Sequence, residues 1–149
     1  MVIGIFGESC TGKSSFADIL KKQLDAEVYS GKDYLRFAKN EADAKLSFQK
    51  KLKEANDVHI IYVITEKEHL AFLPENAVRV LVTADLEIIK ERFAKRMHGN
   101  LPAPVVKLLE SKHGCFDHEP HHMHIVSQES DLNEASSQIL KNIQQQQVT

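Results

Sequence analysis

Short, continuous apolar runs alternate with longer amphipathic stretches along this chain. The runs 2–6, 58–64 and 77–82 are almost entirely apolar, which is typical of strands buried on both faces of a parallel sheet. Weaker runs at 27–29 and 124–126 predict two further strands. We therefore expect a sheet of five strands.

Helical periodicity fills the intervals between these strands. Residues 15–24 place their apolar side chains on one stripe, as in a helix that packs on a sheet. A charged stretch from about residue 32 to about residue 56 predicts a long helix, in one piece or in two. Its weak apolar stripe consists of Phe37, Leu46, Phe48 and Leu52.

Four shorter helices are expected further along. Thr65-x-x-Glu68 resembles a capping box that opens a short helix, and Asp85 is expected to cap the next one. The inward side of that helix is predicted to comprise Leu86, Ile89, Phe93 and Met97. Residues 105–112 and 131–143 complete the set. Strands that alternate with helices predict an α/β fold, with a doubly wound parallel sheet flanked by helices in one domain over residues 1–149.

The loop after the first strand carries the most specific motif. It reads Gly7-Glu8-Ser9-Cys10-Thr11-Gly12-Lys13-Ser14 and is followed by Ser15 at the start of a helix. This is the G-x-x-x-x-G-K-S pattern of the phosphate-binding P-loop, in the strand–loop–helix context that the motif needs. The loop amides and the helix N-terminus would cradle phosphate oxygens. We therefore expect residues 7–15 to bind the nucleotide.

Within this motif, Lys13 is expected to reach the β- and γ-phosphates, and Ser14 to bind Mg²⁺. The acidic residue that usually follows the third strand is absent, because Ile60–Thr65 contains no Asp. The first carboxylate is Glu66. Either Glu66 or Asp33 would then have to hold the water shell of the metal, or metal binding is weaker than usual.

A second cluster follows the expected second strand. Asp33 and Arg36 lie three residues apart, so that on a helix they share a face. The carboxylate could orient or deprotonate an acceptor hydroxyl, and the guanidinium could bind an acceptor phosphate or carboxylate. Ser30-x-x-Asp33 is also a capping-box pattern. The position at a strand end favours the functional interpretation.

A third cluster precedes a Gly- and Pro-containing break at residues 98–104. Arg92 and Arg96 lie four residues apart on the expected helix and would stabilise the charge of a moving phosphoryl group. The alternative is a solvated basic face. The hinge-like break favours mobile arginines that close over the site.

Composition excludes several classes of function. The chain has 149 residues and a formal net charge of -2, so it offers no basic field for nucleic acid. No apolar run is long enough to span a bilayer, and the two cysteines, Cys10 and Cys115, do not form a disulfide framework. We therefore expect a cytoplasmic protein. The spacing of His118, His121, His122 and His124 fits no standard zinc finger, which favours exposed or hydrogen-bonded histidines.

Taken together, these motifs resemble the nucleoside-monophosphate-kinase-like group of small P-loop kinases. Ser30–Arg36 is similar to the acceptor motif of cytidylate kinases, although Leu35 separates Tyr34 from Arg36. Adenylate and shikimate kinases share the same outline. The resemblance implies a three-layer P-loop fold with a five-stranded parallel sheet, and ATP with Mg²⁺ as cofactors. It also implies catalytic roles for Lys13, Asp33, Arg92 and Arg96, and acceptor binding by Asp33 and Arg36. A small lid at about residues 97–117, with Arg92 and Arg96 serving it, is implied as well.

Two functions remain open at this stage. The first is a kinase that transfers the γ-phosphoryl of ATP to a nucleotide or another small acceptor, as a monomer or homodimer. The second is a non-catalytic nucleotide-binding module, or a simple NTPase, whose nucleotide state is read by a partner. The missing acid after the third strand favours the second function, and the Asp33, Arg36 and lid arginines favour the first.

Overall fold

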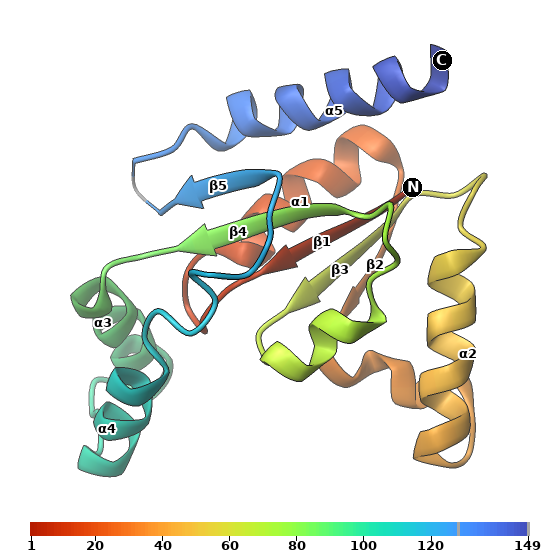
Figure 1. The fold of residues 1–149 in the computed structure, drawn as a ribbon. Helices are drawn as coiled ribbons and strands as arrows, with labels where there is room; N and C mark the ends of the chain where they lie inside the picture. The colour runs from red at the N-terminus through yellow and green to blue at the C-terminus, as the bar shows by residue number, and fades with distance from the viewer. Residues whose placement is uncertain (128, 149) are drawn as a thin grey trace.

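A computed structural model describes residues 1–127 and 129–148 of the chain. Its centre is a five-stranded sheet in which every neighbouring pair is parallel, with the spatial order β2-β3-β1-β4-β5 (Figure 1). The strands are β1 (Val2–Phe6), β2 (Glu27–Ser30), β3 (Ile60–Ile64), β4 (Val78–Thr83) and β5 (Met123–Val126). The predicted five-stranded parallel sheet is confirmed.

Helices connect these strands along the chain. They are α1 (Lys13–Leu24), α2 (Glu41–Lys53), α3 (Leu86–Arg96), α4 (Ala103–Lys112) and α5 (Leu132–Val148), with two 3₁₀ helices, η1 (Gly31–Phe37) and η2 (Lys67–Phe72). The charged stretch after β2 forms two pieces, because Asn40 caps α2 by accepting a hydrogen bond from the Asp43 amide at 2.8 Å.

The sheet is covered on both faces. Side chains alternate along β1, so that Ile3 and Ile5 pack on the side of α1 and α5, whereas Val2 and Phe6 pack on the opposite side. Figure 1 shows α1 and α5 together above the sheet. The result is the three-layer arrangement that strongly apolar parallel strands require.

An aromatic cluster fills the second face and surrounds Phe48 of α2. The Phe48 side chain is fully buried, and its ring lies 4.9 Å from that of Tyr62, centroid to centroid. The other rings that pack on Phe48 are Tyr29, Tyr34, Phe37 and Phe72. Because these rings come from β2, η1, β3 and η2, the cluster sets how the connections after β2 and β3 sit on the sheet.

Three local predictions need correction. Leu46 is 65% exposed and Met97 is 36% exposed, so neither packs inward: Leu46 lies off the buried stripe of α2, and Met97 is the C-cap of α3. Thr65 does not open a capping box. Glu66, one residue later, is the N-cap of η2 and has no side-chain cap bond, whereas Thr65 lines the cavity beside the P-loop.

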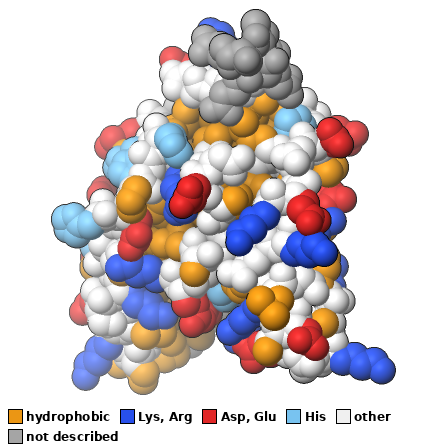
Figure 2. Space-filling view, turned by 45° about the vertical axis from the view of Figure 1, so that its right-hand side comes forward, with side chains coloured by type: hydrophobic (Ala, Val, Ile, Leu, Met, Phe, Trp, Pro, Cys, Tyr) orange, Lys and Arg blue, Asp and Glu red, His pale blue; other side chains and the backbone are white. Residues whose placement is uncertain are grey.

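The surface carries charges of both signs. Figure 2 shows Lys and Arg side chains mixed with Asp and Glu over the face in view. Both cysteines are free thiols, with Cys10 buried. No helix in the described part of the chain is long and apolar enough to cross a membrane.

The aromatic cluster generates a stability prediction. We expect Phe48→Ala to lower the free energy of unfolding by about 3–5 kcal/mol, because it leaves a cavity between five rings. Leu46→Ala, on the exposed side of the same helix, is the matched control and should stay within about 0.5 kcal/mol of the wild type. Urea unfolding measures both values, and equal losses would contradict the central position of Phe48.

Candidate nucleotide-binding site

The P-loop begins where β1 ends, between the two strands that flank it. The Gly7 amide donates to the Ile64 carbonyl of β3 at 3.2 Å. On the other side, a Cβ at Gly7 would collide with the carbonyl oxygen of Val82 in β4. Any side chain would therefore push the loop off the sheet, which explains the first glycine of the motif.

The loop then turns into the N-terminus of α1. Cys10 and Gly12 both have left-handed backbone angles, with φ of 64° and 100°, and Gly12 is the N-cap of the helix. The Thr11 hydroxyl donates to the Glu8 carbonyl at 3.0 Å and closes the turn. The free amides of the first helical turn thus face the loop, where they and the helix dipole favour an anion.

Lys13 lies inside the loop. Its side chain is buried, and its ammonium donates to the carbonyl oxygens of Gly7, at 2.8 Å, and Glu8. The pKa of Lys13 is lowered to about 8, chiefly because burial disfavours the charged ammonium. The nearby Arg96 guanidinium acts in the same direction, and the Glu8 carboxylate in the opposite one. A phosphate group would restore the charged form, because an adjacent anion favours the ammonium.

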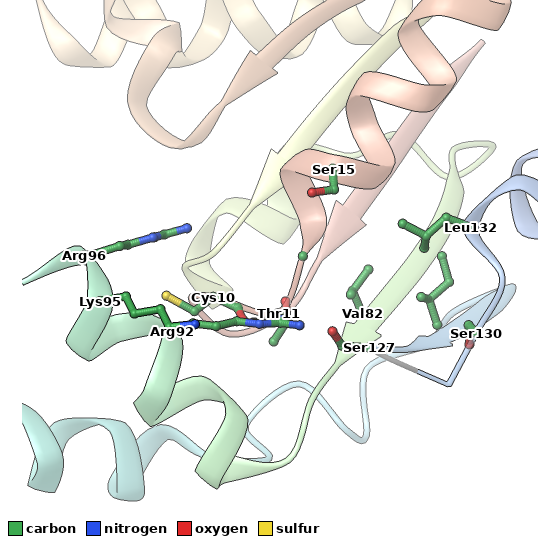
Figure 3. Close-up of a pocket in the computed structure, with 12 residues that line it drawn as sticks. Cys10, Thr11, Ser15, Val82, Arg92, Lys95, Arg96, Ser127, Ser130 and Leu132 are labelled. Carbon is green, nitrogen blue, oxygen red and sulfur yellow. Dashed lines mark hydrogen bonds between the residues drawn. The ribbon is translucent and has the colours of Figure 1, made fainter. Parts of the chain in front are cut away.

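Two cavities flank the loop. The larger, of about 600 Å³, lies between the loop, α3 and the segment after β5, and its polar lining includes Arg92, Lys95, Arg96, Ser127 and Ser130. Figure 3 shows Arg92 and Arg96 reaching into it from α3. The smaller cavity, of about 330 Å³, is lined by residues that include Lys13, Ser14, Ser30, Thr65 and Arg96.

Charge in these cavities has one sign. Arg92 donates to the Cys10 carbonyl at 3.0 Å across 82 residues of sequence, and Arg96 lines both cavities. Among the described residues, no carboxylate lines either cavity. The structure thus brings the predicted arginines to the phosphate loop, where with Lys13 they form a cationic site suited to a polyphosphate.

Asp33 and Arg36 lie in η1, beside the smaller cavity but outside its lining. Asp33 Oδ2 accepts from the Ser30 amide at 2.8 Å, as in the capping box that the sequence also allowed. Arg36 contacts the same oxygen at 3.8 Å, and the two side chains are 68% and 42% exposed. Their pairing is therefore a surface contact that a ligand can replace at little cost.

The metal-binding candidates are separated. Ser14 lines the smaller cavity together with Thr65, the residue that follows β3. Glu66 is exposed and is not among the residues that line that cavity; its carboxylate lies near Glu68 and His69 instead. A hydroxyl beside the phosphate loop fits Mg²⁺, which takes most of its ligands from water and phosphate.

No pattern in the sequence predicts the two contacts that the Glu8 side chain of the loop makes. The Glu8 carboxylate accepts from the Gly114 amide at 3.2 Å and lies 3.0 Å from His113 Nδ1. These residues follow α4, in the segment predicted as a lid. Lys90 of α3 pairs with Glu110 of α4 at 3.0 Å, so this segment touches both the loop and α3.

The histidines near β5 are engaged in hydrogen bonds. His122 Nδ1 accepts from the Arg79 amide at 2.9 Å, and His124 Nε2 lies 2.8 Å from the Thr83 hydroxyl. These bonds attach β5 to the edge of β4, and the histidines belong to no group of potential metal ligands found in the described residues.

Comparison with known proteins identifies the fold of this chain but does not identify its activity. No protein-family model matches the sequence, and no curated protein is significantly similar to it. Several solved structures are similar over nearly their whole length. They include shikimate kinase from Acinetobacter baumannii in complex with shikimate, with 15% identity, a TM-score of 0.64 and coverage of 99% of this chain and 95% of that one.

Two further structures were solved with nucleotides. YorR from Bacillus subtilis, in complex with phosphorylated GDP, has 19% identity, a TM-score of 0.63 and coverage of 100% and 99%. The APS kinase of Mycobacterium tuberculosis, in complex with AMPPNP and APS, has 16% identity, a TM-score of 0.54 and coverage of 96% of each chain. This chain therefore has the fold of the small P-loop kinases.

The lowered pKa of Lys13 predicts proton uptake on nucleotide binding. Above pH 8 the free protein holds Lys13 largely neutral, whereas bound phosphates favour the charged form. At pH 9 we expect uptake of about one proton per nucleotide, and affinity should fall about tenfold per pH unit above pH 8. Calorimetry of ATP binding in buffers of different ionisation enthalpy measures the uptake.

The matched control is Lys22→Met, which alters an exposed lysine of the same helix and should leave the uptake unchanged. Lys13→Met should bind ATP more weakly and without proton uptake. Wild-type binding at pH 9 with no proton exchange would contradict this account of Lys13.

Proposed function

We propose that this protein is an ATP- and Mg²⁺-dependent kinase that transfers the γ-phosphoryl group to a small acceptor, in the cytoplasm. The observation that carries the proposal is the position of Arg96, which lines both cavities of the P-loop. A group at that point can contact a nucleotide in one cavity and a phosphoryl group that moves into the other.

In this proposal the larger cavity binds the nucleoside part of ATP, and the loop holds its phosphates. Lys13 contacts the β- and γ-phosphates, and Ser14 provides the protein ligand of Mg²⁺, which neutralises charge between the phosphates. Arg92 and Arg96 stabilise the negative charge that spreads over the γ-phosphoryl group during transfer. Closure of the segment 97–117 would exclude water from the reaction.

The acceptor approaches from the η1 side of the smaller cavity. An acceptor oxygen forms a bond to the γ-phosphorus while the bond to the bridging oxygen of ADP breaks. For a hydroxyl acceptor, the proton passes to Asp33, whose Oδ1 is left open because both of its described contacts are made by Oδ2. Arg36 binds an anionic group of the acceptor. Nucleoside monophosphates and small phosphorylated or carboxylated alcohols fit this arrangement.

A second candidate is a nucleotide-binding module without transferase activity. It is favoured by Thr65, because this residue occupies the end of β3 in the cavity, where a carboxylate would help to hold the metal. In that case the nucleotide would control the position of the segment that contacts Glu8, and a partner would read that position.

The first experiment follows labelled γ-phosphoryl from ATP·Mg²⁺ to a panel of nucleoside monophosphates, nucleosides, shikimate and simple sugars. A product that disappears in Lys13→Ala would support the kinase and name its acceptor class. Tight ATP binding without any product would favour the nucleotide-binding module.

Arg36→Ala tests the acceptor side. We expect it to raise the KM for the acceptor by about tenfold or more, because a charged hydrogen bond is lost, and to leave the Kd for ATP nearly unchanged. Arg79→Ala is the control, because this arginine lies in β4 outside both cavities, and it should change neither constant. If Arg36→Ala also changed neither, the acceptor assignment would be wrong.

A further inference from the structure

His69 is a deeply buried histidine with unsatisfied ring nitrogens. The residue is only 3% exposed, and neither Nδ1 nor Nε2 has a hydrogen-bond partner among the described residues. A buried polar group without a partner is destabilising, and such groups in folded proteins usually bind water, an ion or a ligand. A water molecule, ion or ligand would therefore satisfy the ring nitrogens of His69.

Packing holds the imidazole in place. The ring lies 5.8 Å from that of Tyr34 and 6.0 Å from that of Phe72, between centroids, and the His69 amide donates to the Glu66 carbonyl at 3.0 Å. A phenylalanine would fill the same space without leaving polar atoms unpaired. The two nitrogens are thus the feature that packing alone does not explain.

Two carboxylates lie beside this imidazole. Glu66 and Glu68 are both exposed, and each places a carboxylate oxygen within 4.8 Å of a ring nitrogen of His69 and of the other carboxylate. The distance from His69 Nε2 to Glu68 Oε1 is 3.9 Å. This is too long for a hydrogen bond. It is shorter than the roughly 4.4 Å that two ligands of one ion can span when each lies about 2.0–2.2 Å from the metal, and a small movement of the exposed Glu68 side chain would bring it to tetrahedral spacing.

We propose that Glu66, Glu68 and His69 bind a divalent transition-metal ion of the Zn²⁺ class. An imidazole with two carboxylates suits Zn²⁺ or Co²⁺, whereas Mg²⁺ and Ca²⁺ prefer oxygen ligands alone. The ion binds one ring nitrogen of His69 that otherwise has no partner, and it connects the end of β3 to η2. Within the described residues, this is the one group of three such side chains close enough to share an ion.

The metal site is separate from the expected Mg²⁺ site and independent of the proposed kinase activity. Ser14 and Thr65 face the cavity beside the P-loop, whereas Glu68 and His69 line another cavity, of about 560 Å³, between η1, α2 and η2. Three protein ligands leave a coordination position for water or a small ligand. A ligand in the cavity between η1, α2 and η2 could therefore reach the ion.

Zn²⁺ titration of the metal-stripped full-length protein against a chromophoric chelator tests the site. We expect one ion to bind, and the affinity to fall at least about tenfold in His69→Phe and in the double variant Glu66→Gln/Glu68→Gln. Excess Mg²⁺ should not displace the ion. Visible absorption of the Co²⁺ form should change in both variants, because each removes ligands.

His59→Gln is the matched control. His59 also has a buried Nδ1 without a described partner but belongs to no such ligand group, so its variant should bind Zn²⁺ like the wild type. The histidines at 118–124 are present in every variant, so any binding to them cancels in the comparison.

Equal Zn²⁺ affinity in the wild type and both ligand variants would overturn the proposal. The glutamine variant decides the matter if His69→Phe fails to fold, because both carboxylates are exposed and their replacement leaves the core intact. Zn²⁺ should also raise the melting temperature of the wild type and of His59→Gln, but not of the glutamine variant. A rise of the same size in all of them would count against the site.

Discussion

The position of Gly7 between two strands is the constraint on which this molecule depends. Its amide is bound by the β3 carbonyl of Ile64, and the Val82 carbonyl of β4 occupies the space where a side chain would be. Because β1 lies between β3 and β4 in the sheet, all three strands must be assembled before the loop can take this shape. The conformation of the P-loop therefore depends on three strands of the sheet and not on the loop alone.

A second consequence of that assembly is an excess of positive charge at one edge of the sheet. Lys13, Arg92 and Arg96 converge on the loop, and no described carboxylate lines the two cavities there. Burial and Arg96 together lower the pKa of Lys13, which means that the free site is electrostatically strained. A polyphosphate would relieve this strain, and the relief would contribute binding free energy that a neutral ligand does not receive.

The aromatic face of the sheet, opposite α1 and α5, links the proposed acceptor side to the rest of the fold. The aromatic rings around Phe48 come from four elements, and the Tyr62 hydroxyl donates to the Gly31 carbonyl at 2.7 Å, which attaches η1 to β3. This packing places Asp33 and Arg36 near the smaller cavity and also buries His69. The same cluster thus supports both proposed sites, one for an anionic acceptor and one for a metal ion.

The sequence by itself determined the parallel sheet and the P-loop, since both rest on local patterns: near-continuous apolar strands and one motif between a strand and a helix. It also indicated both roles open to Asp33. It did not reveal the Glu8 contacts with His113 and Gly114, the bond from Arg92 to Cys10, or the unpaired nitrogens of His69. Those contacts join residues that, for Glu8 and Arg92, lie 82 to 106 positions apart. Only the packing of whole elements brings such residues together, so the tertiary structure decided them.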